Sequence, residues 1–202
     1  MPQVSITALV AAVRSGRLIG FPTDTVPALA AHPEAAAEIY VAKQRTLDKP
    51  LILMAATTDA LWPFVQGDLA TQSIWKSIAK QYWPGALTLV LPKSDRVPST
   101  INPETPSTIG IRVPNWPLAQ MILQQTGPLA TTSLNRSGQP PLEDLATISS
   151  EFPSVFTPTL DLWQLPRESD SSAPRVRIPS TVVQWREEGW LVLREGGVKL
   201  QG

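Results

Sequence analysis

The sequence predicts an α/β fold built on a twisted sheet of mixed strand direction. Short apolar runs typical of buried strands alternate with stretches of helical period in the first part of the chain. Two later apolar runs flank the turn residues 186–189, a pattern typical of a hairpin. Because strand–helix alternation favours parallel pairs and a hairpin adds an antiparallel pair, we expect both kinds in one sheet.

The elements before residue 83 follow from local signals. Ser5 is suited to cap a helix whose apolar residues recur at helical spacing as far as Val13, and Gly16 ends it. The apolar run that follows stops at Pro22 and is typical of a buried strand. We therefore expect, after the first helix, a strand over 18–21, a helix over 34–45, a strand over 51–55 and a helix over 68–82.

The later elements have similar signals. A helix over 117–125 should be capped by Asn115 and closed by Gly127. Residues 166–179 are expected to form a loop inside one domain, 1–202, because strand-like sequence resumes after them. The other expected strands lie over 87–91, 109–113 and 128–132, with hairpin strands over 181–185 and 190–194.

Composition excludes several classes of protein. Lys and Arg number 17, as do Asp and Glu, and this balance disfavours a protein that coats nucleic acid or anionic membrane by bulk charge. The absence of Cys rules out disulfides, thiolate catalysis and Cys metal sites. His32 is the single histidine, so any Ser-His-Asp triad would need that ring and no multi-histidine metal site can form.

The expected compartment is the cytoplasm. No stretch approaches the roughly 20 apolar residues that a membrane helix requires. The segment from Met1 to Thr7 has no basic region followed by a long apolar run, so we see no secretory signal.

Two hydroxyls and a carboxylate follow the first expected strand, in the segment FPTDTV over 21–26. Ligands of open α/β sheets bind beyond the carboxyl ends of strands, so these groups could hold a polar substrate. A plain turn of Pro, Thr and Asp explains the same residues and, for this segment alone, is the commoner outcome.

Three cations cluster at the end of the expected helix 34–45 and just before the next strand. Lys43, Arg45 and Lys49 combine point charges with a planar fork, which suits a polyphosphate. The helix dipole explains cations at a helix C-terminus equally well. Because positions i and i+2 do not share a helix face, Lys43 and Arg45 can reach one ligand only if the helix ends between them or the ligand wraps around it.

The segment TTSLNRSG over 131–138 leads from a strand into hydroxyls, an amide, a cation and a Gly. Such groups and free main-chain N–H groups suit phosphate or carboxylate oxygens, although a Ser/Asn/Gly loop without function is commoner. The chain contains neither a P-loop nor G-x-G-x-x-G, so any nucleotide is held in another way.

Four further segments complete the set. The rigid turn and strand of WPGALT (83–88) are explained by structure alone, and IGIRVP (109–114) places Arg112 on an apolar strand. A cation there is costly unless it reaches an anion or the surface. His32 is expected at a helix entry or on the surface. The other two segments are IPSTVV (178–183) and LREGG (193–197).

In this order the segments PTDTV, KQR with KPL, WPGALT, GIRVP, SLNRSG, PSTVV and LREGG resemble the YrdC family, whose members include the threonylcarbamoyl-AMP synthases. The resemblance runs from about Leu18 to Gly197. It implies a YrdC-like twisted mixed sheet with helices around a large concave, basic cavity. It also implies the conversion of L-threonine, bicarbonate and ATP into L-threonylcarbamoyl-adenylate and pyrophosphate. A partner transferase complex would then modify the adenosine beside the anticodon of tRNA.

The resemblance also implies a set of site residues. The family's catalytic lysine, arginine, serine and asparagine fall on Lys43, Arg45, Ser133 and Asn135. The substrate or nucleotide contacts that it implies are Thr23, Thr25, Thr88, Arg112, Ser180 and Arg194. Mg²⁺ is expected to bind with ATP, and no metal ligands are assigned because no carboxylate cage is visible. The reaction needs phosphate charge to be neutralised and two anions held together, with little acid–base work from the protein.

The chain departs from the family pattern at three places. Pro27 and Ala28 stand where the family has an aromatic residue and a Gly, so an aromatic wall of the threonine pocket is missing. Thr46 replaces a common Pro. The segment before the PST motif lacks a frequent Gly and carries Arg175 and Arg177.

Two other functions stay open. The same basic concavity could bind RNA or tRNA without chemistry, in which case the protein would show no threonine-dependent pyrophosphate release and its RNA affinity would fall steeply with salt. A paralogue with this fold could instead handle another carbamoyl or acyl adenylate, as does the YrdC-like domain of hydrogenase-maturation proteins. Pro27 and Ala28 motivate this second alternative.

Overall fold

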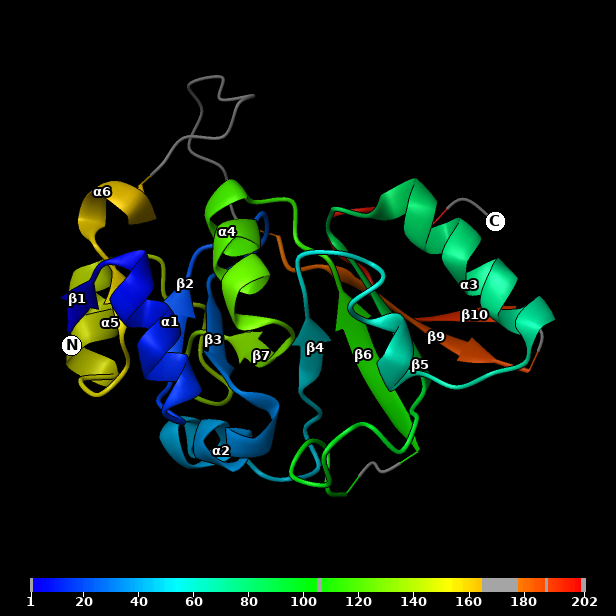
Figure 1. Ribbon diagram of the computed structural model, residues 1–202, viewed down its shortest axis with the longest axis horizontal. Helices are drawn as coiled ribbons and strands as arrows, with labels where there is room; N and C mark the ends of the chain where they lie inside the picture. The colour runs from blue at the N-terminus through cyan, green and yellow to red at the C-terminus, as the bar shows by residue number, and fades with distance from the viewer. Residues whose placement is uncertain (1, 105–106, 165–177, 188, 201–202) are drawn as a thin grey trace.

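A mixed sheet of eight strands runs through the molecule in the order β10-β9-β5-β6-β4-β7-β3-β2 (Figure 1). The computed structural model describes residues 2–104, 107–164, 178–187 and 189–200. Strand β4 is parallel to β6 and β5 to β9, while the other neighbours are antiparallel, which confirms the predicted sheet. The strands are β2 (Ile19–Phe21), β3 (Ala28–Ala31), β4 (Ile52–Met54), β5 (Leu87–Pro92), β6 (Thr108–Arg112), β7 (Leu129–Ser133), β9 (Thr181–Arg186) and β10 (Gly189–Arg194).

Helices flank this sheet on both faces. A small second sheet pairs β1 (Gln3–Val4) with β8 (Thr157–Pro158). Single 3-10 turns occur at η1 (Pro33–Ala35) and η2 (Trp62–Phe64). The helices of the described residues are α1 (Ile6–Arg14), α2 (Ala37–Lys43), α3 (Leu69–Tyr82), α4 (Pro117–Thr126), α5 (Leu145–Glu151) and α6 (Leu160–Trp163).

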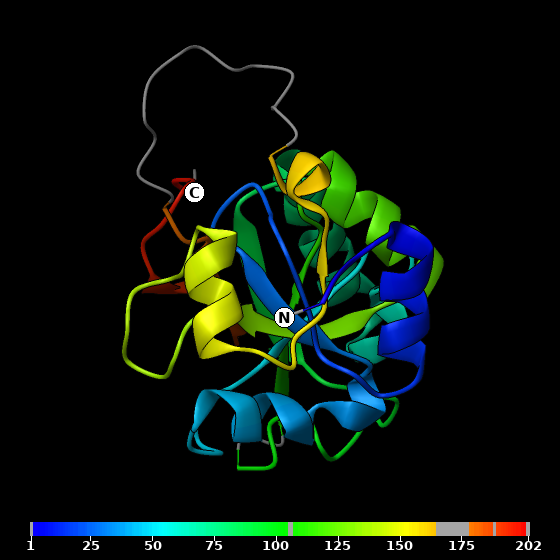
Figure 2. The same cartoon turned by 90° about the vertical axis from the view of Figure 1, so that its left-hand side faces the viewer.

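The alternation of side chains along each strand divides the core between the two faces. On β3, Ala28 and Ala30 pack in one cluster with residues of α1 and α4, whereas Leu29 and Ala31 pack in another with residues of α2, α3 and α5. Figure 2 shows α1 and α4 on one side of the sheet and α5 on the other. The first cluster draws on β2, β3 and β7, so on that face α1 and α4 cover one half of the sheet.

Three expected helix boundaries are confirmed. Ser5 caps α1 by accepting a bond from the amide of residue 8 at 3.3 Å, and Asp68 caps α3 by accepting from residue 71 at 2.8 Å. Gly127 closes α4 with a φ of 78°. His32 stands at the entry of η1, where Nδ1 accepts a bond from the amide of Glu34, as expected.

Two expected boundaries are wrong. The helix expected over 34–45 ends as α2 at Lys43, because Gln44 adopts the left-handed conformation with φ 50° and ψ 47°. Asn115 does not cap α4: Trp116 occupies the N-cap position and the helix begins at Pro117, whose fixed φ suits a first turn.

Strand β3 and helix α5 were not expected. The sequence Ala-Leu-Ala-Ala of β3 lacks both alternation and β-branched residues, and its pairing with β2 and β7 supplies what local propensity does not. The expected hairpin is confirmed by the antiparallel pairing of β9 with β10. Residues 166–177 of the expected loop and Glu188 of the expected turn lie outside the described residues.

Candidate active site

A cavity of about 470 Å³ opens over the half of the sheet beside α1 and α4. Its floor is formed by outward-facing residues of β4, β5, β6 and β9, such as Ile52, Val90, Gly110 and Val182. Among the described residues that line it are four cationic side chains and no Asp or Glu. The cations are Arg45, Lys49, Arg112 and Arg194. A cavity with this lining attracts anions.

Seven of the ten residues expected in the site line this cavity. The other three lie directly behind it, since Thr23 contacts Thr25 and both Lys43 and Asn135 contact Ser133. The seven that line it are Thr25, Arg45, Thr88, Arg112, Ser133, Ser180 and Arg194. The structure thus gathers the expected residues around one hollow.

Lys43 is enclosed at the end of α2. Its side chain is 1% exposed, and Nζ donates to the main-chain oxygens of Ser133 and Asn135 and to Asn135 Oδ1, the last at 3.0 Å. Burial, with Arg45, Arg136 and Lys49 nearby, lowers the pKa of Lys43 to about 7. The ammonium therefore contacts the turn after β7 and does not line the cavity.

The free energy of unfolding should depend on pH because of this lowered pKa. Between the folded pKa of about 7 and the ordinary value of 10.5, unfolding takes up a proton at Lys43, so the free energy of unfolding rises with pH. The rise is at most about 1.4 kcal/mol per pH unit for one group. Urea unfolding of wild type and Lys43→Met, compared across this range, measures it as a growing difference between the two proteins.

Lys80→Met is the matched control for this measurement, because Lys80 is an exposed residue of α3. Its difference from wild type should stay flat with pH. A flat difference for Lys43→Met as well would show that Lys43 keeps an ordinary pKa in the folded protein.

Arg45, two residues after Lys43 at the end of α2, lines the cavity instead of lying behind it. Its guanidinium donates to the main-chain oxygens of Lys49 and Pro50, at 3.3 and 3.0 Å, and to Thr132 Oγ1 at 3.3 Å. Lys49 is exposed at the rim, where Nζ donates to Ser137 Oγ at 3.0 Å. The break at Gln44 meets the condition under which Lys43 and Arg45 can serve one site, since it ends the helix between them.

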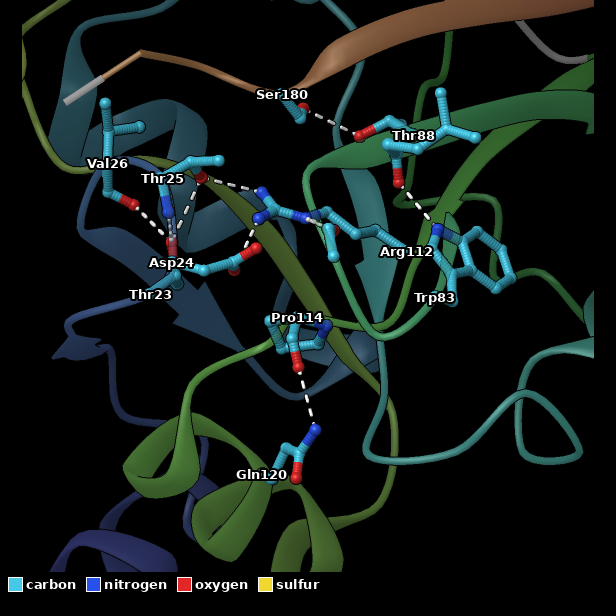
Figure 3. A network of polar contacts seen from close by, with 12 residues as sticks. Thr23, Asp24, Thr25, Val26, Trp83, Thr88, Arg112, Pro114, Gln120 and Ser180 are labelled. Atoms are coloured by element: carbon cyan, nitrogen blue, oxygen red, sulfur yellow. Dashed lines mark hydrogen bonds and ion pairs between the residues drawn. The ribbon is translucent and has the colours of Figure 1, made fainter. Parts of the chain in front are cut away.

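Arg112 and Asp24 form an ion pair of 2.6 Å at the edge of the cavity, with side chains that are 4% and 10% exposed. Figure 3 shows the guanidinium directed at Asp24 and Thr25. Arg112 Nη1 donates to Thr25 Oγ1 at 2.8 Å and Nε to the main-chain oxygen of Gly85 at 3.0 Å. The costly cation on an apolar strand thus reaches an anion, as the sequence requires.

Thr88, Ser180 and Arg194 form a third polar group. Thr88 Oγ1 lies 2.9 Å from Ser180 Oγ (Figure 3), and Arg194 Nη2 donates to Ser180 Oγ at 3.2 Å and to its main-chain oxygen at 2.8 Å. Strands β5 and β9 run parallel here, which brings residues far apart in the chain together.

The main chain beside this third group packs closely against Gly196. A Cβ at residue 196 would lie 2.3 Å from the oxygen of Pro179 and 2.5 Å from main-chain atoms of Ser180 and Thr181. Main-chain atoms cannot retreat, so we expect Gly196→Ala to lower the free energy of unfolding by about 1–3 kcal/mol. Gly189→Ala is the control, because a Cβ at Gly189 meets nothing within 4 Å. Equal stability of the two variants in urea unfolding would contradict the prediction.

Several residues of this site are not among the ten expected from the sequence. The sequence offers Asp24 either as a carboxylate that could hold a polar substrate or as a turn residue, and its ion pair with Arg112, 88 positions away, has no local signal. Thr132 and Gln184 line the cavity, but a hydroxyl or amide in a strand has no local signal for function. Lys49 belongs to the cation cluster that the sequence indicates but is not one of the ten expected site residues.

The described residues form neither a metal-ligand cluster nor a membrane-spanning helix. They contain no group of three or more His, Asp or Glu side chains placed to hold a metal ion. None of the helices they form is long and apolar enough to span a membrane.

The fold and the site define an α/β protein with a cation-lined cavity on one face of a mixed sheet. The family profile of Sua5, YciO and YrdC, described as "Telomere recombination", matches residues 11–196. The chain therefore belongs to the Sua5/YciO/YrdC family.

Curated relatives and solved structures agree with this membership. The threonylcarbamoyl-AMP synthase of Pyrococcus abyssi is 31% identical over 94% of this chain and 53% of its own length. That of Klebsiella pneumoniae is 30% identical over 80% of this chain and 85% of its own. The crystal structure of Pyrococcus abyssi Sua5 complexed with L-threonine has a TM-score of 0.79 and 30% identity, over 95% of this chain and 54% of that one. The chain thus spans about half the length of the Pyrococcus relative.

Proposed function

We propose that the protein is an L-threonylcarbamoyladenylate synthase, a nucleotidyltransferase that uses L-threonine, bicarbonate and ATP. The observation that carries the proposal is the cavity lined by Arg45, Lys49, Arg112 and Arg194 without a carboxylate. Relatives named threonylcarbamoyl-AMP synthase and a relative's structure complexed with L-threonine support the choice of substrates.

The proposed reaction joins two anions. The threonine amine attacks the carbon of bicarbonate, water leaves, and a carbamate forms. A carbamate oxygen then attacks the α-phosphorus of ATP, and pyrophosphate departs with the electron pair of the broken P–O bond. Both steps require negative groups to be held in contact, and fixed cations lower the barrier by offsetting their charge.

The donor groups of the cavity fit this task. A guanidinium has five N–H donors, and the bonds within the described part of the chain use three of those of Arg45. Arg194 Nη1 makes no bond to the described residues. We assign Arg45, Lys49 and Arg194 to the triphosphate, with Thr88 and Ser180 beside Arg194.

The amino acid is assigned to the opposite polar group. Arg112 donates three bonds within the described residues, so two of its N–H groups can meet a carboxylate in a planar pair. Thr23 supports Thr25, whose hydroxyl lies against Arg112. Pro27 and Ala28 line the cavity, so the departure from the family pattern lies inside the site.

Mg²⁺ enters this proposal as part of the substrate Mg·ATP. The lining residues in the described ranges include no carboxylate, so the chain itself offers the hard oxygen ligands of this ion only as hydroxyls and carbonyls. The phosphates of ATP are the natural ligands. Transfer of the product to tRNA by a separate transferase in the cytoplasm is part of the same proposal.

The decisive experiment incubates the protein with Mg·ATP, bicarbonate and L-threonine. We expect pyrophosphate release that depends on threonine, and the mass of the adenylate in the mixture. Release that depends on another amino acid or on carbamoyl phosphate would identify a paralogue with a different substrate. No release, together with RNA affinity that falls steeply with salt, would identify an RNA-binding protein without this chemistry.

A further inference from the structure

Oxygen atoms of the turn from Ser133 to Asn135 enclose the ammonium of Lys43. From this geometry we infer that Lys43 is a positioning residue, which holds the turn at the edge of the cavity and leaves contact with substrate phosphates to Arg45. The expected effect on kcat rests on the proposed function. The effect of Lys43 on the stability of the turn can be measured without it.

When Lys43 is protonated, its donors are fully used. An ammonium has three N–H groups, and three oxygens of Ser133 and Asn135 accept from Nζ. The side chain is 1% exposed and is not among the lining residues of the cavity. A phosphate could bind Nζ only by displacing one of these oxygens, and a buried oxygen without its donor is costly.

Arg45 is placed for the role that Lys43 cannot take. The left-handed Gln44 ends α2 between them, so the two side chains leave the chain in different directions. Arg45 lines the cavity and keeps two N–H donors beyond the three that it spends on described neighbours.

Asn135 completes the hold on the turn. Its Oδ1 accepts from Lys43 and, at 2.5 Å, from Ser133 Oγ, while Nδ2 donates to the main-chain oxygens of Arg136 and Gln139 at 2.8 and 2.5 Å. Because the hydroxyl proton of Ser133 points at Asn135, Ser133 presents lone pairs to the cavity. It is therefore suited to accept the N–H of an amine or carbamate, and not to donate to a phosphate oxygen.

Three methionine variants separate positioning from phosphate contact. Lys43→Met removes the ammonium and keeps an unbranched apolar stem, Arg45→Met removes a cation that lines the cavity, and Lys80→Met is the exposed control on α3. For each variant, calorimetry gives the affinities for Mg·ATP and AMP, and steady-state assays give kcat and KM for threonine-dependent pyrophosphate release. Hydrogen exchange then reports on the turn through the amides of Leu134 and Leu142, which bond to the oxygens of Pro27 and Leu134.

In Lys43→Met we expect kcat to fall at least ~10-fold and the exchange of both amides to accelerate at least ~10-fold. Its preference for ATP over AMP should stay within about 3-fold of wild type, because no phosphate contact is lost. Arg45→Met should lower that preference at least ~10-fold and leave the exchange unchanged. Lys80→Met should match wild type throughout.

The inference is overturned if Lys43→Met loses its preference for ATP as Arg45→Met does, or if its two amides exchange at the wild-type rate. If Lys43→Met lacks a cooperative unfolding transition, Lys43→Gln is measured instead, since an amide keeps two N–H donors for the three oxygens. A wild-type protein that releases no pyrophosphate would contradict the proposed function alone. The exchange rates would then still decide the role of Lys43.

Discussion

Replacing Arg112 by methionine is expected to lower the free energy of unfolding by about 3–5 kcal/mol, the usual effect of breaking a buried ion pair from one side. The variant removes the guanidinium that offsets the charge of Asp24, which is 10% exposed, and removes the donors to Thr25 and to the oxygen of Gly85. Urea unfolding of the purified variant measures the loss.

The double variant Arg112→Met/Asp24→Asn tests the cause. Neutralising Asp24 removes the buried charge that Arg112 no longer offsets, so at least about 1 kcal/mol should return. A double variant no more stable than Arg112→Met would place the loss in packing instead. A loss below about 1 kcal/mol in Arg112→Met itself would mean that the pair is screened as at an exposed surface.

Replacing Arg45 by alanine is expected to lower the rate of threonine-dependent pyrophosphate release about 10²-fold, the scale of one preorganised stabiliser of transition-state charge. The guanidinium lines the cavity and is aligned by Thr132 and two main-chain oxygens, so its donors are fixed before the substrate arrives. Stability should change little, because Arg45 is only half-buried and forms no ion pair with the described residues. Steady-state kinetics and urea unfolding check both parts.

Lys49→Ala is the comparison for Arg45→Ala. Lys49 lines the same cavity but is exposed at the rim, so solvent screens its charge. Its removal should cost roughly 10-fold or less in the same assay. Wild-type rates of pyrophosphate release in Arg45→Ala would remove Arg45 from the catalytic machinery.

Most of the helices and strands could be predicted because their signals are local. The cap at Ser5, the cap at Asp68 and the stop at Gly127 each depend on neighbours within one helical turn. Strand β3 could not be predicted because Ala-Leu-Ala-Ala has no strand signal of its own. It exists because β2 and β7 pair with it from either side.

The candidate site could likewise be predicted only in part. The order of seven short motifs was enough to select the ten residues that the structure gathers around one cavity. The motifs could not tell that Lys43 and Asn135 lie behind the wall while Arg45 and Ser133 face the hollow. For Lys43 and Arg45, that division depends on the left-handed turn at Gln44.

By itself, the sequence determined the class of fold, the family and the set of polar residues expected in the site. It could do so because periodicity, capping and motif order are properties of neighbouring positions. Only the tertiary structure decided which donors stay available to a ligand. Asp24 meets Arg112 across 88 positions, and Lys43 meets Asn135 across 92, because the sheet brings their strands and loops together. A donor group is used only when an acceptor lies next to it in the folded protein. A sequence pattern therefore cannot show which donors remain available to a ligand.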